Sequence, residues 1–62
     1  MIVAYPLDDI VSVNKKDKKR IIYQHAGIAT LVVVVMDNMM ILENKKGDRF
    51  PVNKNRVVWC EY

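Results

Sequence analysis

The sequence predicts a small all-β domain that folds as a five-stranded barrel with a long, bent second strand. Its apolar segments are rich in valine and isoleucine, and none repeats at the three- and four-residue spacing of a helix face. Residues 32–35 are four consecutive valines, whose stiff, branched side chains favour extended backbone. Short polar segments separate the apolar ones, as turns separate strands. The whole chain, residues 1–62, is therefore interpreted as one domain.

The strands are expected at 9–14, 20–36, 39–44, 49–53 and 56–62. The second is far longer than the usual strand of about 5–6 residues. Gly27 lies near its middle, where a bend or bulge would let the strand serve both halves of a barrel.

Turns are expected at 15–19, 37–38 and 45–48, and a short 3₁₀ step at 54–55. Residues 1–5 are apolar and end at Pro6, which pushes the preceding residue towards extended backbone. They are expected either as a short extra edge strand or as a segment that covers one end of the barrel.

Length and composition favour a homo-oligomer. A chain of 62 residues buries only about 60% of its unfolded surface and usually needs a disulfide, a metal or a partner. The single cysteine excludes an intrachain disulfide, and one cysteine with one histidine is too few for a zinc site. We therefore predict no metal and no cofactor, and we assign the surplus of a 52% hydrophobic composition to subunit contacts.

Charge and cysteine content point to a soluble, cytoplasmic protein. The net charge of +3 permits a nucleic-acid partner without requiring one. A free cysteine fits a reducing compartment, and the opening MIVAYPLDD lacks the basic segment of a signal peptide. The most apolar stretch, residues 26–36, is shorter than the roughly 20 residues of a membrane span, so no membrane association is expected.

Two candidate surfaces follow from the expected meander, because alternate turns of a meander lie at the same end. One end is basic and suits a phosphate backbone, or serves only to keep the protein soluble. The other is rich in asparagine and suits base edges and phosphates, or reflects only the preference of asparagine for turns. The basic set is Lys15, Lys16, Lys18, Lys19, Arg20, Lys45, Lys46 and Arg49. The second set is Asp37, Asn38, Met39, Asn53, Lys54, Asn55 and Arg56.

The other chemically notable side chains have simpler interpretations. His25 has no cysteine or carboxylate at ligand spacing and is expected to be structural or on the surface. Cys60 is expected at a buried or interface position. The aromatic residues Tyr23, Phe50, Trp59 and Tyr62 are expected in the core or a subunit seam, with a base-stacking platform as the alternative. No nucleophile–base pair or phosphate-binding glycine loop is present, so we predict a protein that is not an enzyme.

Two segments of the C-terminal half resemble the Sm/LSm/Hfq superfamily of SH3-like barrels. Residues 37–42, DNMMIL, are similar to the Hfq segment D-Q-F-x-I-L at the start of the third strand. Residues 52–59, VNKNRVVW, align with the second Sm motif, I-R-G-x-N-V-V-Y. The resemblance covers residues 37–62. It departs from the family at Met39, which replaces a base-stacking aromatic, and at Lys54, which replaces a glycine.

The resemblance implies a five-stranded SH3-like (Sm-like) barrel whose copies form a ring that binds single-stranded RNA, or DNA, through the second set of residues. In such rings the fourth strand pairs with the fifth strand of the next subunit. Here the expected fourth strand contains Pro51, which has no N–H to donate to a neighbouring strand. The alternatives are an SH3-like or KOW-like module that binds a protein, and a purely structural β-oligomer. The last predicts that Lys54→Ala with Arg56→Ala changes no interaction.

Overall fold

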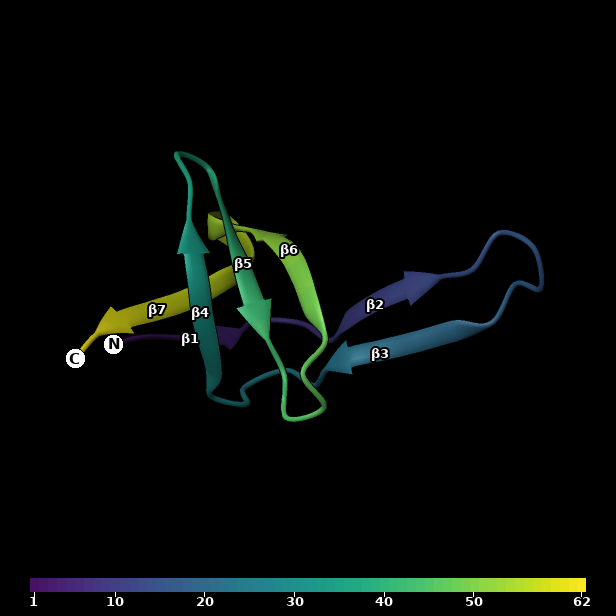
Figure 1. Cartoon of the computed structure of the whole chain (residues 1–62), viewed down its shortest axis with the longest axis horizontal. Coiled ribbons are helices and arrows are strands. Elements are labelled where there is room, and N and C mark those ends of the chain that lie inside the picture. The colour runs from purple at the N-terminus through teal and green to yellow at the C-terminus, as the bar shows by residue number, and fades with distance from the viewer.

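The computed structural model describes all 62 residues as seven strands and one 3₁₀ turn. Five strands form an antiparallel sheet in the order β6-β5-β4-β1-β7, and β2 and β3 pair separately. The β2–β3 hairpin projects from one side of the five-stranded sheet (Figure 1). The all-β prediction is therefore confirmed. The elements are β1 (Ile2–Pro6), β2 (Ile10–Val13), β3 (Arg20–Gln24), β4 (Thr30–Val35), β5 (Met39–Glu43), β6 (Arg49–Asn53), η1 (Lys54–Arg56) and β7 (Val57–Glu61).

The first strand of the main sheet is β1, so residues 1–5 do form an extra strand, but the expectation that it lies at an edge is wrong, as is the alternative of a covering segment. This strand lies inside the sheet, hydrogen-bonded to β7 on one side and β4 on the other. Its side chains alternate, and Ala4 is completely buried. Pro6 is the last residue of the strand, and beyond it the Leu7 N–H still donates to the Arg56 carbonyl at 2.9 Å.

The expected first strand at 9–14 and the single strand at 20–36 also need correction. The first is β2, which pairs only with β3 and lies outside the main sheet. The second divides into β3 and β4, which belong to different sheets. Gly27 lies between them with a φ of +77°, a left-handed conformation that only glycine adopts without strain. Its N–H donates to the Pro6 carbonyl at 2.8 Å, which fixes the turn against the end of β1.

The C-terminal half follows the prediction closely. Strands β5, β6 and β7 agree with the expected segments to within a residue or so at each end, and the step before the last strand is the 3₁₀ turn η1. Polar residues mark every one of these boundaries in the sequence, so the turn positions are unambiguous there.

A small core fills one face of the sheet. Directly opposed pairs across β5 and β6, Met40 with Val52 and Leu42 with Phe50, form its centre. Ala4, Ile10 and Val57 complete it. Strands β1 and β7 run nearly crosswise to β5 and β6 (Figure 1), so the sheet twists strongly around this core. No ladder joins β6 to β7, and the barrel is not closed. The structure has no helix of the length and hydropathy that a membrane span requires.

Pro51 interrupts nothing within the sheet. The Asn44 N–H donates to the Asp48 carbonyl and the Lys54 N–H to the Asn38 carbonyl, both at 3.1 Å. Along an antiparallel ladder, hydrogen-bonded and non-hydrogen-bonded residue pairs alternate. The backbone N–H and C=O groups of Phe50 and Val52 therefore also point towards β5. The backbone of Pro51 therefore faces outward, and the free edge of β6 lacks a donor at its centre.

Candidate nucleic-acid interface

The second predicted set of residues forms one surface. The β4–β5 turn carries Asp37 and Asn38, and η1 carries Lys54, Asn55 and Arg56. The Lys54 N–H donates to the Asn38 carbonyl at 3.1 Å, which joins the two loops. Met39 and Asn53 lie directly opposite each other where β5 begins and β6 ends. The prediction that these loops share one end of the sheet is confirmed. We call this set, Asp37, Asn38, Met39, Asn53, Lys54, Asn55 and Arg56, the joined-loop surface.

Local backbone bonds hold the two loops in shape. The Met36 N–H donates to the Met39 carbonyl at 2.9 Å and closes the β4–β5 turn. The Val57 N–H donates to the Lys54 carbonyl and closes η1. Both turns are closed by backbone groups, and the Asn53 side chain makes no capping bond. Asn38, Asn55 and Arg56 are exposed, so their polar side chains remain available to a ligand.

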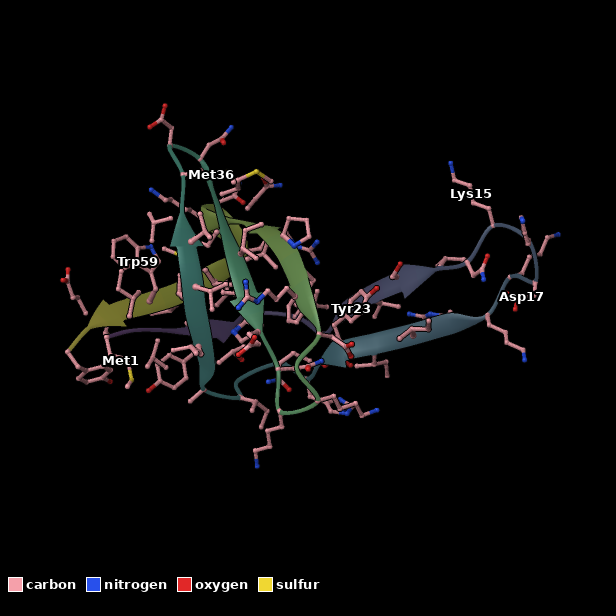
Figure 2. All side chains as sticks on the ribbon, viewed as in Figure 1. Met1, Lys15, Asp17, Tyr23, Met36 and Trp59 are labelled. Atoms are coloured by element: carbon pink, nitrogen blue, oxygen red, sulfur yellow. The ribbon has the colours of Figure 1, made fainter.

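Trp59 lies beside this surface and not in the core; the sequence predicts a core or seam position for it, with a base-stacking platform as the alternative. The Lys54 ammonium lies over its ring, with Nζ 5.9 Å from the ring centroid, at the outer limit of a cation–π contact. The indole is 41% exposed on β7 (Figure 2). Alternation along β7 does not predict this exposure, because Trp59 lies on the same face of the strand as the buried Val57.

The predicted basic end does not exist as one surface. Lys15, Lys16, Lys18 and Lys19 lie at the tip of the β2–β3 hairpin, far from the main sheet (Figure 2). Lys45 and Lys46 lie in the β5–β6 loop, beside the opposite end of β3, where the Asn44 side chain contacts Tyr23. The prediction fails because it placed the hairpin strands inside the barrel, whereas they form a separate arm. Arg20 begins β3 at the hairpin side, and Arg49 is engaged by Glu43.

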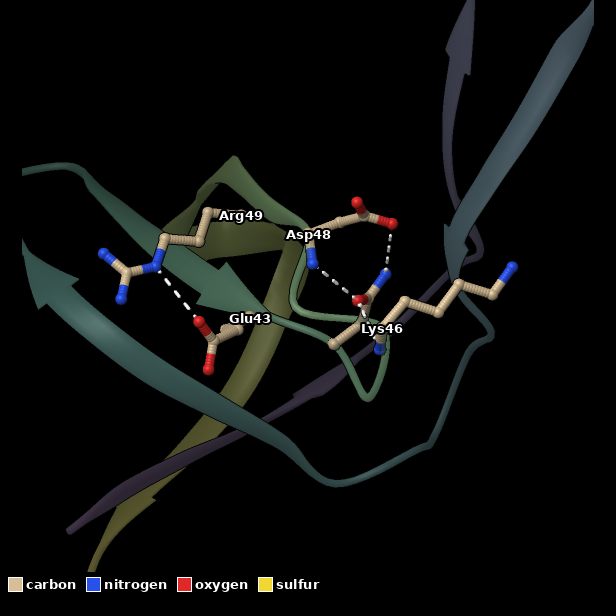
Figure 3. Close-up of polar contacts among 5 residues, drawn as sticks. Glu43, Lys46, Asp48 and Arg49 are labelled. Atoms are coloured by element: carbon tan, nitrogen blue, oxygen red, sulfur yellow. Dashed lines mark hydrogen bonds and ion pairs between the residues drawn. The ribbon is translucent and has the colours of Figure 1, made fainter.

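The side chain of Asn44 holds the β5–β6 loop, which carries Lys46 and Asp48 (Figure 3). Its Oδ1 accepts the N–H groups of Lys46 and Asp48, each at 3.0 Å. Its Nδ2 donates to the Tyr23 carbonyl at 2.9 Å, which ties the loop to β3. Beside it, the Arg49 Nε donates to the Glu43 carboxylate at 3.1 Å across the β5–β6 pair.

An open groove of about 340 Å³ lies where β3 meets this loop. Apolar side chains and cations share its lining, so it suits a ligand that is both apolar and acidic. Tyr23 on its wall stacks on the buried Phe50, with ring centroids 5.0 Å apart and planes 9° apart. The lining residues are Ile22, Tyr23, Gln24, His25, Ile28, Asn44, Lys45 and Lys46.

The remaining titratable and sulfur-bearing side chains form no further site. His25 Nδ1 lies 3.7 Å from the Asp9 carboxylate, and both side chains are largely open to solvent. That carboxylate also accepts the Ala26 N–H at 2.8 Å, which is a structural role. Cys60 is exposed on β7. No group of three or more His, Cys, Asp or Glu side chains is placed to hold a metal ion.

Comparison with known proteins identifies no matching family model, no matching curated protein and no matching solved structure.

Proposed function

We propose that the protein is a non-catalytic module that binds single-stranded RNA, or single-stranded DNA, at the joined-loop surface together with Trp59. The observation that carries the proposal is the position of Lys54, whose backbone joins the two loops and whose ammonium lies over the exposed indole. An exposed aromatic ring beside a cation is the pairing that unstacked bases and their phosphates recognise.

Each member of the surface has a role in this proposal. A base stacks on the Trp59 ring. Trp59 thereby replaces the base-stacking aromatic of Hfq, whose place in the motif is occupied here by Met39. Lys54 and Arg56 contact the phosphates on either side. The amides of Asn38 and Asn55 donate and accept, as base edges require. A single strand is favoured over a duplex because only unpaired bases offer a free face to an aromatic ring.

We infer that the sheet is an open form of the SH3-like barrel of the Sm type, with an added β2–β3 arm. Three features support this: the first and last strands lie side by side, a 3₁₀ turn precedes the last strand, and residues 37–42 and 52–59 carry the Sm-like patterns. The β2–β3 arm inserted between the first two strands of the sheet is a departure from that pattern.

The experiment is fluorescence anisotropy with a labelled oligo-uridine of about ten to twelve nucleotides, within the usual range of site sizes. Lys54→Ala with Arg56→Ala is expected to weaken binding more than about tenfold, since it removes two phosphate contacts. Lys16→Ala with Lys19→Ala removes the same charge at the distant hairpin tip and is the matched control, with an expected change below about twofold. Equal losses for the two variants would show attraction by net charge alone and would contradict the proposal.

The groove beside β3 favours a second candidate, a module that binds an acidic, apolar segment of another protein. Lys45 and Lys46 supply the positive side, and Ile22 and Ile28 the apolar side. In the same anisotropy experiment, a labelled peptide of alternating glutamate and leucine serves as the probe. The second candidate is favoured over the first if the protein binds this peptide, loses that binding on Lys46→Glu, and does not bind oligo-uridine.

A further inference from the structure

The two free edges of the main sheet differ in what they offer to another strand. Along the β1–β7 ladder, Leu7 forms a backbone hydrogen bond with Arg56, and Met1 forms backbone hydrogen bonds with Tyr62. Because bonded pairs alternate, Val58 and Cys60 direct their polar groups towards β1. Val57, Trp59 and Glu61 therefore direct theirs outward, along the open edge of β7.

Two residues on this edge carry a complete set of unused backbone groups. The Val57 N–H is engaged by the Lys54 carbonyl in η1. Neither the ladders nor the remaining backbone bonds use the N–H and C=O groups of Trp59 and Glu61. A row of unpaired donors and acceptors is a template for another strand.

The side chains of β7 do little to prevent such pairing. Val58 is 55% exposed and Cys60 is also open to solvent. Glu61 is the only charged residue of the strand, and there is no proline or lysine in it. The edge of β6 is different, since Pro51 removes its central donor and Arg49 adds a charge.

We propose that β7 pairs antiparallel with β7 of a second copy of this chain, across a two-fold axis at Cys60. When Trp59 of one copy lies opposite Glu61 of the other, the unused N–H of each residue meets the unused C=O of its partner. No other antiparallel register pairs all of these groups. The pairing is isologous and joins the two sheets into one continuous sheet. In a ring built by pairing β7 with β6 of the next copy, with Trp59 opposite Pro51, the Trp59 carbonyl has no donor, because Pro51 supplies no N–H.

This register would allow a disulfide to form between the two copies. Cys60 faces Cys60 of the second copy in a non-bonded pair, where Cα atoms are about 4.5 Å apart. That separation lies within the range of a disulfide. On the same face, Val58 opposes Tyr62 of the second copy, an aromatic and β-branched pair that stabilises antiparallel strands.

The test begins with the mass of the protein by analytical ultracentrifugation over a range of concentrations up to millimolar. An edge contact of this length falls in the small class of interfaces, so we expect a dimer that dissociates on dilution. Glu61→Pro removes one outward N–H from each copy and leaves the β1 ladder intact. It is expected to weaken dimerisation more than about tenfold. Glu61→Ala removes the same carboxylate, keeps the N–H and is expected to dimerise at least as well as the natural sequence.

A cross-linking measurement makes the test independent of how the proline variant folds. Copper-phenanthroline, the oxidant, is expected to join Cys60 to Cys60 rapidly in the native protein, and slowly in urea, where the edge is lost. A monomer at every concentration overturns the proposal, as does an assembly of more than two subunits. An unchanged mass for a folded Glu61→Pro variant, or equal cross-linking rates in the native and urea-treated protein, also overturns it.

Discussion

Tyr5 and Tyr62 bring two hydroxyl groups together where the chain termini meet. Their Oη atoms are 3.4 Å apart, and the Met1 amine donates to the Tyr62 carbonyl at 3.0 Å. The hydrogen bond with Tyr5 raises the pKa of Tyr62 above its usual value of 10.0, with smaller contributions from the charges of Tyr5 and Cys60 and from burial. The contact therefore favours the neutral phenol.

The pH dependence of this contact follows from the direction of the shift. A phenol whose pKa is raised on folding contributes stability below its unfolded pKa, near 10. That contribution disappears as the pH rises through the higher folded value. We expect Tyr5→Phe to lower the pH at which the last tyrosine titrates, measured by ultraviolet absorbance of the phenolate. Tyr23→Phe is the control, because Tyr23 stacks on Phe50 instead, and an equal downward shift there would contradict the assignment.

The β2–β3 hairpin is the element with the weakest attachment. An isolated two-stranded hairpin is marginally stable in water, and this one exposes Val13, Ile21 and Ile22 by about half. At its base, Tyr23 stacks on Phe50 and its carbonyl accepts the Asn44 amide. The position of the whole arm therefore depends on a few contacts at one end.

Asn44→Ala is expected to release the base of this arm. The substitution removes the bond to Tyr23 and both bonds that shape the β5–β6 loop, at a cost of about 1–3 kcal/mol. We expect faster amide hydrogen exchange in β3 and in the β5–β6 loop. Asn14→Ala is the matched control, since the Asn14 side chain accepts a hydrogen bond only from the Lys16 N–H in the hairpin tip. Slow exchange retained in β3 of the Asn44 variant would show that the aromatic stack alone holds the arm.

Sequence patterns predict the elements of this chain well where turns are marked by polar residues and poorly where they are not. Residues 37–62 alternate clear apolar and polar segments, and β5, β6, η1 and β7 follow them. Between Arg20 and Met36 the apolar sequence is interrupted only by Gln24, His25, Gly27 and Thr30. These scattered residues do not distinguish a bend within one strand from a break between two sheets. The inclusion of β1 inside the sheet is a tertiary pairing between residues far apart in sequence, which periodicity does not encode.

The candidate site also contains residues that the sequence places correctly and residues that it does not. Asp37, Asn38 and the η1 residues meet because strand order dictates which turns share an end, and the C-terminal strands were assigned correctly. The basic set separates because its two halves depended on the misassigned strands. Trp59 was not assigned to the surface, since its exposure depends on how β1 and β7 twist around the core.

At the scale of the whole molecule, partner surfaces follow from how little of the chain is buried. Only nine of 62 residues are buried, which leaves a small core and much apolar surface. Pairing through β7 extends the sheet and covers part of that surface. The joined-loop surface then occurs once in each copy, so a single strand long enough to contact both copies would bind with higher effective affinity.

Trp59 is the only tryptophan, so its intrinsic fluorescence reports directly on the proposed site. The most direct test is titration of the protein with unlabelled oligo-uridine at several salt concentrations, followed by that fluorescence. A base stacked on the indole is expected to quench the emission, and the affinity is expected to fall steeply as salt rises, because phosphate contacts release counterions. Unchanged emission at saturating oligonucleotide and low salt would contradict binding at the joined-loop surface and Trp59.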